Sequence, residues 1–336
     1  MEKIIHLNKE IPAEAPLTEQ EAGEARERVA GIVSNIETVI RGKHEQVELT
    51  VLCLLAEGHA LIEDIPGVGK TSLVNALSKT IACGSKRIQF TPDVMPSDIS
   101  GYSIYNQKSG EFEFRPGAAM SNIVLADEIN RASAKTQSAL LEIMEERQVT
   151  VDGQTYLLTP PFMVLATQNP IDSLGTYQLP EAQIDRFMVK FSLGYPAFED
   201  EVNVLMAGRQ AKREIGSVVT AEQVCTLISQ CGRVYVSREV SAYIVRIVEA
   251  TRNHAEIRLG ASPRGSIALH AMARAAALGA GRDYVLPDDV KRMAPYVLAH
   301  RLILTHKART EKRDERELIR SIVERVVVPV GAEGRK

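Results

Sequence analysis

A glycine-containing segment near the start of the chain carries the residue types that bind a phosphate. Residues 64–71 follow the pattern G-x-x-x-x-G-K-[ST], except that Asp64 replaces the first glycine. Glycines let consecutive backbone N–H groups converge on a phosphate, Lys70 can reach the β- and γ-phosphates, and the Thr71 hydroxyl can ligate Mg²⁺. The segment therefore predicts a nucleoside triphosphate site. The residues expected to contact the nucleotide here are Pro66, Gly67, Val68, Gly69, Lys70, Thr71 and Ser72.

The surroundings of this segment strengthen the prediction, because Gly-Lys-Thr alone also suits a surface turn. An apolar run at residues 60–62 precedes it, as a strand would. An amphipathic stretch at residues 72–82 follows it, as a helix would. A phosphate loop lies between a strand and a helix in this order.

Two acidic residues and an amide follow two other apolar runs. Asp127 and Glu128 come directly after residues 122–126, and Asn169 follows residues 162–166. At the carboxyl end of a parallel strand, Asp127 could hold Mg²⁺ and Glu128 could polarise the water that attacks the γ-phosphate. Asn169 could hydrogen-bond the phosphate and that water. The plainer interpretations are a helix N-cap for the two acids and an ordinary turn for the amide.

The segments that must position these residues predict an α/β fold with a parallel sheet. Five strand-like stretches alternate with helix-like segments and cover residues 60–62, 86–90, 122–126, 162–166 and 188–193. Residues 103–114 and 148–158 read as inserted β-hairpins, the second around the turn signal Asp152-Gly153.

After about residue 197 the pattern contains helices only, so we expect a second, smaller, all-α domain. The expected helices cover residues 198–212, 221–231, 237–256, 262–278, 287–304 and 313–327. The predicted organisation is a mobile leader (1–22), an α/β nucleotide-binding core (23–195), an all-α lid (196–330) and a tail (331–336).

The composition argues against several classes of protein. The formal net charge is -3 and no long block of Lys or Arg occurs, so nucleic acid is not an expected partner. No apolar run is long enough to span a bilayer and the N-terminus has no signal-peptide core, so we expect a cytoplasmic protein. The four cysteines and seven histidines lack zinc-site spacing. Residues 260–264 fail as a nucleophile elbow because Arg264 is the fifth residue.

Taken in order, these segments resemble AAA+ ATPases, and within them the MoxR branch, from about Glu24 to Val328. Each segment is modest alone, but their order is specific. The resemblance rests on residues 40–43 (IRGK), 63–71 (EDIPGVGKT), 127–132 (DEINRA), 140–146 (LLEIMEE), 166–170 (ATQNP), 179–187 (LPEAQIDRF) and 260–264 (GASPR). It implies a P-loop NTPase core with inserted hairpins, followed by a helical lid.

The resemblance also implies roles for the residues of the phosphate site. Lys70 and Thr71 match Walker A, Asp127 and Glu128 match Walker B, and Asn169 matches sensor 1.

Other residues match parts of the family's site that lie further along the chain or before the loop. Arg186 matches the arginine finger that acts in a neighbouring subunit's site, although a cation at a helix end is the plainer interpretation. Arg264 matches sensor 2, through which γ-phosphate occupancy could set the angle between the domains. Ile40 and Gly42 resemble the segment that packs on adenine, although a plain core would suit them equally. Two further interface candidates, Arg131 and Arg147, stay open.

The function that the resemblance implies is Mg²⁺-dependent ATP hydrolysis by a ring, expected to be a hexamer, that remodels or matures another protein. Family members are associated with partners that carry a von Willebrand factor A domain. The hairpins resemble inserts that face the ring pore and touch the client. Tyr102, Tyr105 and Phe112 are candidate contacts, and packing within the hairpin suits them as well.

Three alternative functions are less well supported by the sequence. A nucleic-acid motor or loader carries similar hairpins, but residues 148–158 contain no Lys or Arg. The ATPase subunit of a metal-chelatase would need a large partner subunit. A non-hydrolysing scaffold has no support, because Glu128 and Asn169 are both present. No sequence pattern identifies the client, the pathway or the ring size.

Overall fold

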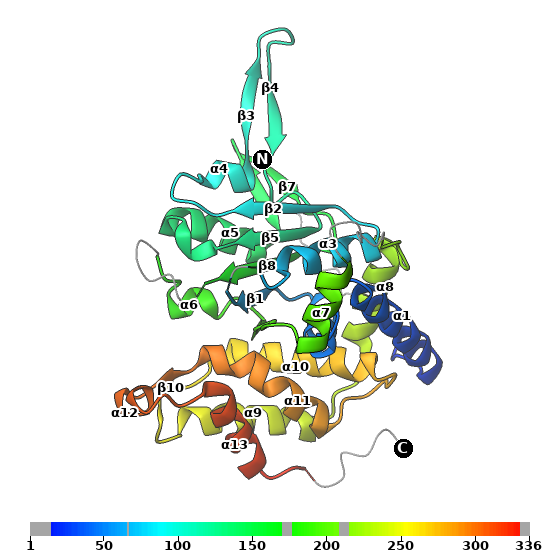
Figure 1. The fold of residues 1–336 in the computed structure, drawn as a ribbon, viewed down its shortest axis with the longest axis vertical. Coiled ribbons are helices and arrows are strands. Elements are labelled where there is room, and N and C mark those ends of the chain that lie inside the picture. The colour runs from blue at the N-terminus through cyan, green and yellow to red at the C-terminus, as the bar shows by residue number, and fades with distance from the viewer. Residues whose placement is uncertain (1–14, 66, 170–176, 208–214, 330–336) are drawn as a thin grey trace, which may run out of the picture.

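The computed structural model describes residues 15–65, 67–169, 177–207 and 215–329. The chain folds around a five-stranded sheet in the order β2-β5-β8-β1-β9, in which every neighbouring pair is parallel (Figure 1). The strands are β1 (Ala60–Glu63), β2 (Ser85–Gln89), β5 (Ile123–Asp127), β8 (Met163–Gln168) and β9 (Val189–Phe191). Each overlaps a predicted strand, so the predicted parallel α/β core is confirmed.

Alternate residues of the central strands pack into two separate apolar clusters. In β5, Ile123 and Leu125 join the first cluster, whereas Val124 and Ala126 join the second. The first cluster also contains side chains of α1 (Glu19–Glu37), α2 (His44–Leu55) and α3 (Lys70–Thr80), and the second contains those of α5 (Ala134–Glu146). Successive side chains of a strand point to opposite faces, so a strand that is buried on both faces is apolar throughout.

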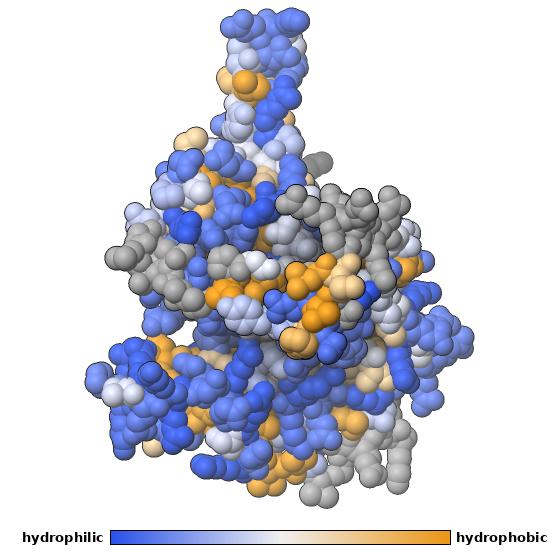
Figure 2. Space-filling view, in the orientation of Figure 1, coloured by the Kyte–Doolittle hydropathy of each residue, from blue (hydrophilic) through white to orange (hydrophobic). Residues whose placement is uncertain are grey.

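Two β-hairpins interrupt the core, as predicted. The strand β3 (Gly101–Asn106) pairs with β4 (Glu111–Pro116), and β6 (Gln148–Val151) pairs with β7 (Gln154–Leu157). The first hairpin follows the short helix α4 (Pro96–Ser100) and projects from the body of the molecule (Figure 1). Figure 2 shows an apolar patch partway along this hairpin, below a hydrophilic tip.

Among the described residues after β9, the regular structure is helical except for one short antiparallel pair of strands and an isolated bridge between Tyr235 and Tyr284. Its helices are α7 (Phe198–Ala207), α8 (Ala221–Arg233), α9 (Arg238–Arg252), α10 (Pro263–Gly279), α11 (Pro287–Leu298), α12 (His306–Thr310) and α13 (Glu315–Arg325). We call the helices from α8 onward the lid. None of the helices in the described ranges is both long and apolar enough to cross a membrane.

The strand pair in the lid, β10 (Ile257–Leu259) with β11 (Ile303–Leu304), was not predicted. The helix expected over residues 287–304 ends at Leu298 and continues as a 3-10 turn (Ala299–Arg301) into β11. The Arg301 side chain donates to the carbonyl of Val297, which a continuing helix would have used for the backbone N–H of residue 301.

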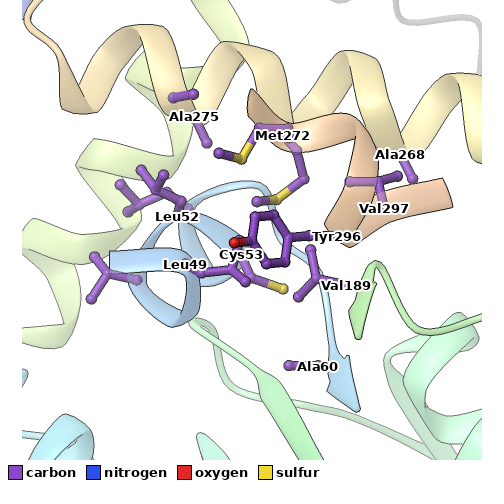
Figure 3. Close-up of a cluster of buried hydrophobic side chains, with 14 of the residues drawn as sticks. Leu49, Leu52, Cys53, Ala60, Val189, Ala268, Met272, Ala275, Tyr296 and Val297 are labelled. Atoms are coloured by element: carbon purple, nitrogen blue, oxygen red, sulfur yellow. The ribbon is translucent and has the colours of Figure 1, made fainter. Parts of the chain in front are cut away.

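The lid and the sheet share an apolar interface (Figure 3). Met272 of α10 and Val297 of α11 lie beside Cys53 of α2 and Val189 of β9, and all four are buried. Because removal of apolar surface from water is the main favourable contribution to packing, the lid is held directly against α2 and β9.

The N-terminal part of the described chain is bound to the lid. The helix α1 begins at Glu19, so the last residues of the leader predicted over 1–22 are helical. Arg233 of α8 donates to the carbonyls of Ala15 and Pro16 at 2.7 and 3.2 Å. The rest of the predicted leader (1–14) and the predicted tail (331–336) lie outside the described residues.

Candidate functional site

Three neighbouring strands end at one edge of the sheet with the predicted site residues. In the parallel register, Glu63 of β1 lies opposite Gln168 of β8, and Ala126 of β5 lies opposite Ala166 of β8. The phosphate loop after β1, the acidic pair at the end of β5 and Asn169 after β8 are therefore adjacent. Neighbouring strands lie about 4.8 Å apart, which is the spacing of groups that can bind one ligand.

The loop between β1 and α3 has the backbone that a phosphate cradle needs. Gly67 and Gly69 have φ of 90° and 97°, a left-handed conformation that strains residues with a Cβ atom. A Cβ atom on either glycine would meet no atom within 4 Å, so open space lies beside the loop. The helix α3 starts directly after Gly69, and the first N–H groups of a helix lack intrahelical acceptors. Pro66 lies outside the described residues.

Lys70 is buried without a negatively charged partner. Only 8% of the residue's surface is exposed, and its Nζ donates a hydrogen bond to the carbonyl of Asp64 at 3.1 Å. No carboxylate pairs with it in the part of the chain that the structure describes. Burial of an unpaired charge is costly, and a phosphate would supply the missing negative charge. The site therefore fits an anionic ligand.

Asp64, which replaces the first glycine of the general pattern, connects the loop to the segment that directly follows the strand β9. Its carboxylate accepts hydrogen bonds from Ser192 Oγ at 3.0 Å, Leu193 N at 2.5 Å and Gly194 N at 3.2 Å. The residue is buried and is not among those with positive φ, so this position does not need a glycine. We did not predict this role, since nothing in the sequence indicates which backbone the carboxylate meets.

The acidic pair is held by residues of two neighbouring strands. Asp127 accepts from Thr167 Oγ1 and from Arg87 Nη2, each at 2.6 Å. Glu128 accepts from Gln89 Nε2 at 3.0 Å, and its backbone N–H donates to Thr167 Oγ1 at 2.8 Å. Sequence reasoning missed these three partners, although the two-residue spacing of Arg87 and Gln89 in a predicted strand indicated a shared face.

The helix-cap interpretation of the acidic pair is wrong. A 3-10 turn (Ile129–Arg131) follows Glu128, and Ser133 caps α5 by accepting from Thr136 N at 3.3 Å. Arg131, one of the open interface candidates, has its Nε 3.1 Å from the carboxylate of Glu128 in the same chain.

The donor set at this edge fits Mg²⁺. Thr71, in the first turn of α3, and Asp127, at the end of β5, offer the hard oxygen atoms that Mg²⁺ takes together with water and phosphate oxygens. When bound, Mg²⁺ would supply positive charge beside the phosphates. Among the described residues, no cluster of three or more His, Cys, Asp or Glu side chains suits a protein-only metal site.

The predicted adenine segment lies against the start of α7. Ile40 is buried, and Gly42 has φ of 67°. A Cβ atom on Gly42 would lie 2.0 Å from the Asp200 carboxylate, which is the end of a flexible side chain and can move, so this position favours glycine for its conformation. Lys43 Nζ donates to the carbonyl of Tyr195 at 2.6 Å.

Arg186 and Arg264 do not lie with the residues above. Both meet the carboxylate of Glu145, Arg264 through Nη2 at 2.5 Å and Arg186 through Nε at 3.4 Å. Glu145 is next to Met144, whose carbonyl is 3.0 Å from Nε2 of His59, directly before β1. The two arginines are therefore at the amino edge of the sheet, opposite the phosphate loop.

A cavity of about 410 Å³ opens at this amino edge between core and lid, with Arg186 and Arg264 in its wall. Arg147, the other open interface candidate, also lines it and donates to the Glu57 side chain at 2.6 Å. Arg147, Arg186 and Arg264 therefore lie together at the edge of the sheet that is opposite the chain's own phosphate loop.

Comparisons with known proteins agree with this arrangement. Residues 59–189 match the ATPase family associated with various cellular activities (AAA), and residues 249–322 match the AAA lid domain. Chaperone MoxR1 of Mycobacterium tuberculosis is 40% identical over 88% of this chain and 81% of its own length. YeaC of Bacillus subtilis, an uncharacterized protein, is 51% identical over 89% of this chain and 94% of its own.

A solved structure matches as well. A Cytophaga hutchinsonii protein assigned as an ATPase superposes with a TM-score of 0.87 at 39% identity, over 93% of this chain and 98% of that one. The AAA domain, the lid and these relatives show an ATP-hydrolysing enzyme. The chain belongs to the MoxR family of AAA+ ATPases.

Proposed function

We propose that this ATPase is Mg²⁺-dependent and works as a ring-shaped homo-oligomer, expected to be a hexamer. Lys70 and Asn169 would bind the phosphates, Thr71 and Asp127 would hold the metal ion, and Glu128 would activate the attacking water. Arg186 and Arg264 of one subunit would complete the site of the next. Hydrolysis would then drive remodelling or maturation of a client protein.

The position of the two arginines carries this proposal. Five residue steps along β1 separate His59 from Asp64, which corresponds to about 16 Å at 3.3 Å per residue. The segment that bears Arg186 is tied to the amino edge, because Met188 N donates to the carbonyl of His59 at 2.8 Å. Arginines that stabilise phosphoryl transfer must touch the phosphate oxygens. This separation supports a site shared between subunits, since the two arginines are remote from the phosphate loop of their own chain.

The projecting hairpin supports a function in client binding. Phe112 is 74% exposed and Tyr102 is 51% exposed, far more than aromatic side chains of a core. Tyr105 packs on Phe112 with ring centroids 5.3 Å apart, so part of its role is structural. Contiguous exposed apolar surface commonly marks an interaction site. The chaperone name of the Mycobacterium tuberculosis relative agrees with this function, and a von Willebrand factor A domain protein is the client class that we propose for testing.

Mixing two inactive variants tests the shared site. Arg186→Ala should remove the donated cation and Glu128→Gln the activating carboxylate, so each variant alone should hydrolyse ATP at least 100-fold more slowly. In a random equimolar mixture, about a quarter of the interfaces combine an intact Glu128 with an intact Arg186. Recovery of about that fraction of native turnover is the expected result.

Two outcomes would reject the shared site. The first is a mixture that stays inactive while both variants bind ATP and assemble. The second is full turnover by a protein that remains monomeric with ATP in size-exclusion chromatography. Glu128→Gln held with ATP also offers a trap for the client, because a ring that cannot hydrolyse should keep the partner bound.

A further inference from the structure

The buried side chain of Arg301 connects the lid to the segment that carries Arg186. Only 3% of this side chain is exposed. Its Nε donates to Asp185 Oδ1 at 2.7 Å, and its Nη2 donates to the carbonyls of Asp185 and Phe187 at 2.9 and 2.8 Å. Its Nη1 donates to the carbonyl of Met188 at 3.2 Å and to that of Val297. The guanidinium therefore binds the chain on both sides of Arg186.

A second contact continues from Asp185 to Arg264. The other carboxylate oxygen of Asp185 accepts from Ser262 Oγ at 2.9 Å. Ser262 is the N-cap of α10, and the same hydroxyl accepts from the backbone N–H of Arg264 at 3.2 Å. One carboxylate is thus shared by the Arg301 clamp and by the helix start that presents Arg264.

We propose that Arg301 is a positioning residue that clamps Arg186 and Arg264 into one rigid unit, which a subunit presents to the nucleotide of its neighbour. The inference rests on the proposed function, since it assumes that the two arginines act on another subunit. Arg301 itself is buried against the backbone of residues 185–188, so it would act through Arg186 and Arg264 and not by contact with the nucleotide. Its planar fork of five N–H groups can hold several acceptors at once, which a lysine ammonium cannot do in the same geometry.

The clamp gives the lid a function beyond packing. The 3-10 turn that carries Arg301 belongs to the lid, whereas Asp185 belongs to the core. Because both arginines are tied to the same carboxylate, a movement of the lid displaces Arg186 and Arg264 together. A displacement of 1 Å of a catalytic group can cost about 100-fold in rate, so the clamp determines whether the next subunit's site is complete.

The test uses Arg301→Lys in the full chain, with mixing as the main readout. Arg301→Lys alone should hydrolyse ATP about 10- to 100-fold more slowly. Mixed with Glu128→Gln subunits it should recover as Arg186→Ala does, because its own phosphate site is intact and receives the neighbour's arginines. Mixed with Arg186→Ala subunits it should not recover, since both variants then lack a working donor.

A matched control separates positioning from stability. Arg282 and Asp289 form a bidentate pair within the lid, at 2.8 and 2.6 Å, with 23% and 9% of their side chains exposed. Arg282→Lys should lower the melting temperature of the protein to a similar degree but leave ATP turnover close to native. Ser262→Ala, which removes the hydrogen bond to Asp185 and the N-cap of α10, provides a second variant if Arg301→Lys does not fold.

The outcomes distinguish the two proposals. If Arg186→Ala recovers with Glu128→Gln but Arg301→Lys and Ser262→Ala do not, the clamp is refuted and the shared site stands. Native turnover in both clamp variants, or an equal loss of turnover in Arg282→Lys, also refutes the clamp. If even Arg186→Ala does not recover, both proposals are wrong.

Discussion

Replacement of Asp64 tests how the phosphate loop is attached to the sheet. The residue is 6% exposed, and Asp64→Ala removes the acceptor for the backbone N–H groups of Leu193 and Gly194. A buried N–H group without an acceptor costs about 1–3 kcal/mol, so two of them would lower the free energy of unfolding by at most about 2–6 kcal/mol. Since Gly194 is only half-buried, we expect a loss in the lower part of this range. The KM for ATP should rise in the same variant, because the loop loses its connection to the segment after β9.

Two measurements and two control variants test this prediction. Circular dichroism during urea titration measures the free energy of unfolding, because the chain has no tryptophan for fluorescence. Steady-state ATP hydrolysis measures the KM. Asp64→Asn keeps one acceptor oxygen and should lose about half as much stability as Asp64→Ala. Asp98→Ala is the matched control: this exposed carboxylate accepts one backbone N–H, from Met95 at 2.8 Å, and its loss should cost about 1 kcal/mol.

Two results would refute this reasoning. One is an equal loss of stability in Asp64→Ala and Asp98→Ala. The other is an Asp64→Gly protein as stable as the native one, since the general pattern has glycine there. Either result would mean that the backbone conformation at this position, and not the carboxylate, holds the loop.

Three further predictions concern pH, metal binding and the client. Burial lowers the pKa of His59 to about 4, so the unfolded chain binds a proton that the folded chain does not. The contribution of His59 to the free energy of unfolding is complete above about pH 6.5 and should fall by about 3 kcal/mol toward pH 4. Urea titrations at a series of pH values should show a weaker dependence of the free energy of unfolding on pH in His59→Gln than in the native protein. Arg87 pairs with Asp127 and would compete with Mg²⁺ at the proposed metal site. Arg87→Gln should therefore lower the Mg²⁺ concentration for half-maximal ATPase activity about two- to fivefold, and an increase would contradict the competition. Phe112→Ser should leave basal hydrolysis unchanged and remove client capture by the Glu128→Gln trap, whereas undiminished capture would exclude the hairpin as the contact.

Local patterns were enough to predict the phosphate edge of the sheet. Lys70 and Thr71 begin a helix that comes after a strand, whereas Asp127 ends one strand and Asn169 follows another, and both of these strands begin with a continuous apolar run. A strand buried on both faces can be recognised from its composition alone, and parallel strands end at one edge, so no tertiary information was required. The hairpin around Asp152 was equally local, because Asp-Gly turns favour positive φ at both positions.

Contacts between distant segments could not be predicted in this way. Arg87 and Thr167 each meet Asp127 across 40 residues of sequence, and Arg301 meets Asp185 across 116. The end of α11 was missed for a local reason, because the side chain of Arg301 takes the carbonyl of Val297, four residues earlier. A periodicity argument contains no information about which side chains compete for a backbone acceptor.

The sequence by itself determined the family and which residues gather at the carboxyl edge, because glycine conformations, strand burial and helix starts are encoded within a few neighbouring residues. Only the tertiary structure decided that Arg186 and Arg264 lie at the opposite edge with Glu145 between them. The direction of the strands and helices gives the physical reason. The helix α5 runs back along the sheet from the acidic pair, so its end, and the arginines bound there, are a full strand length from the phosphate loop.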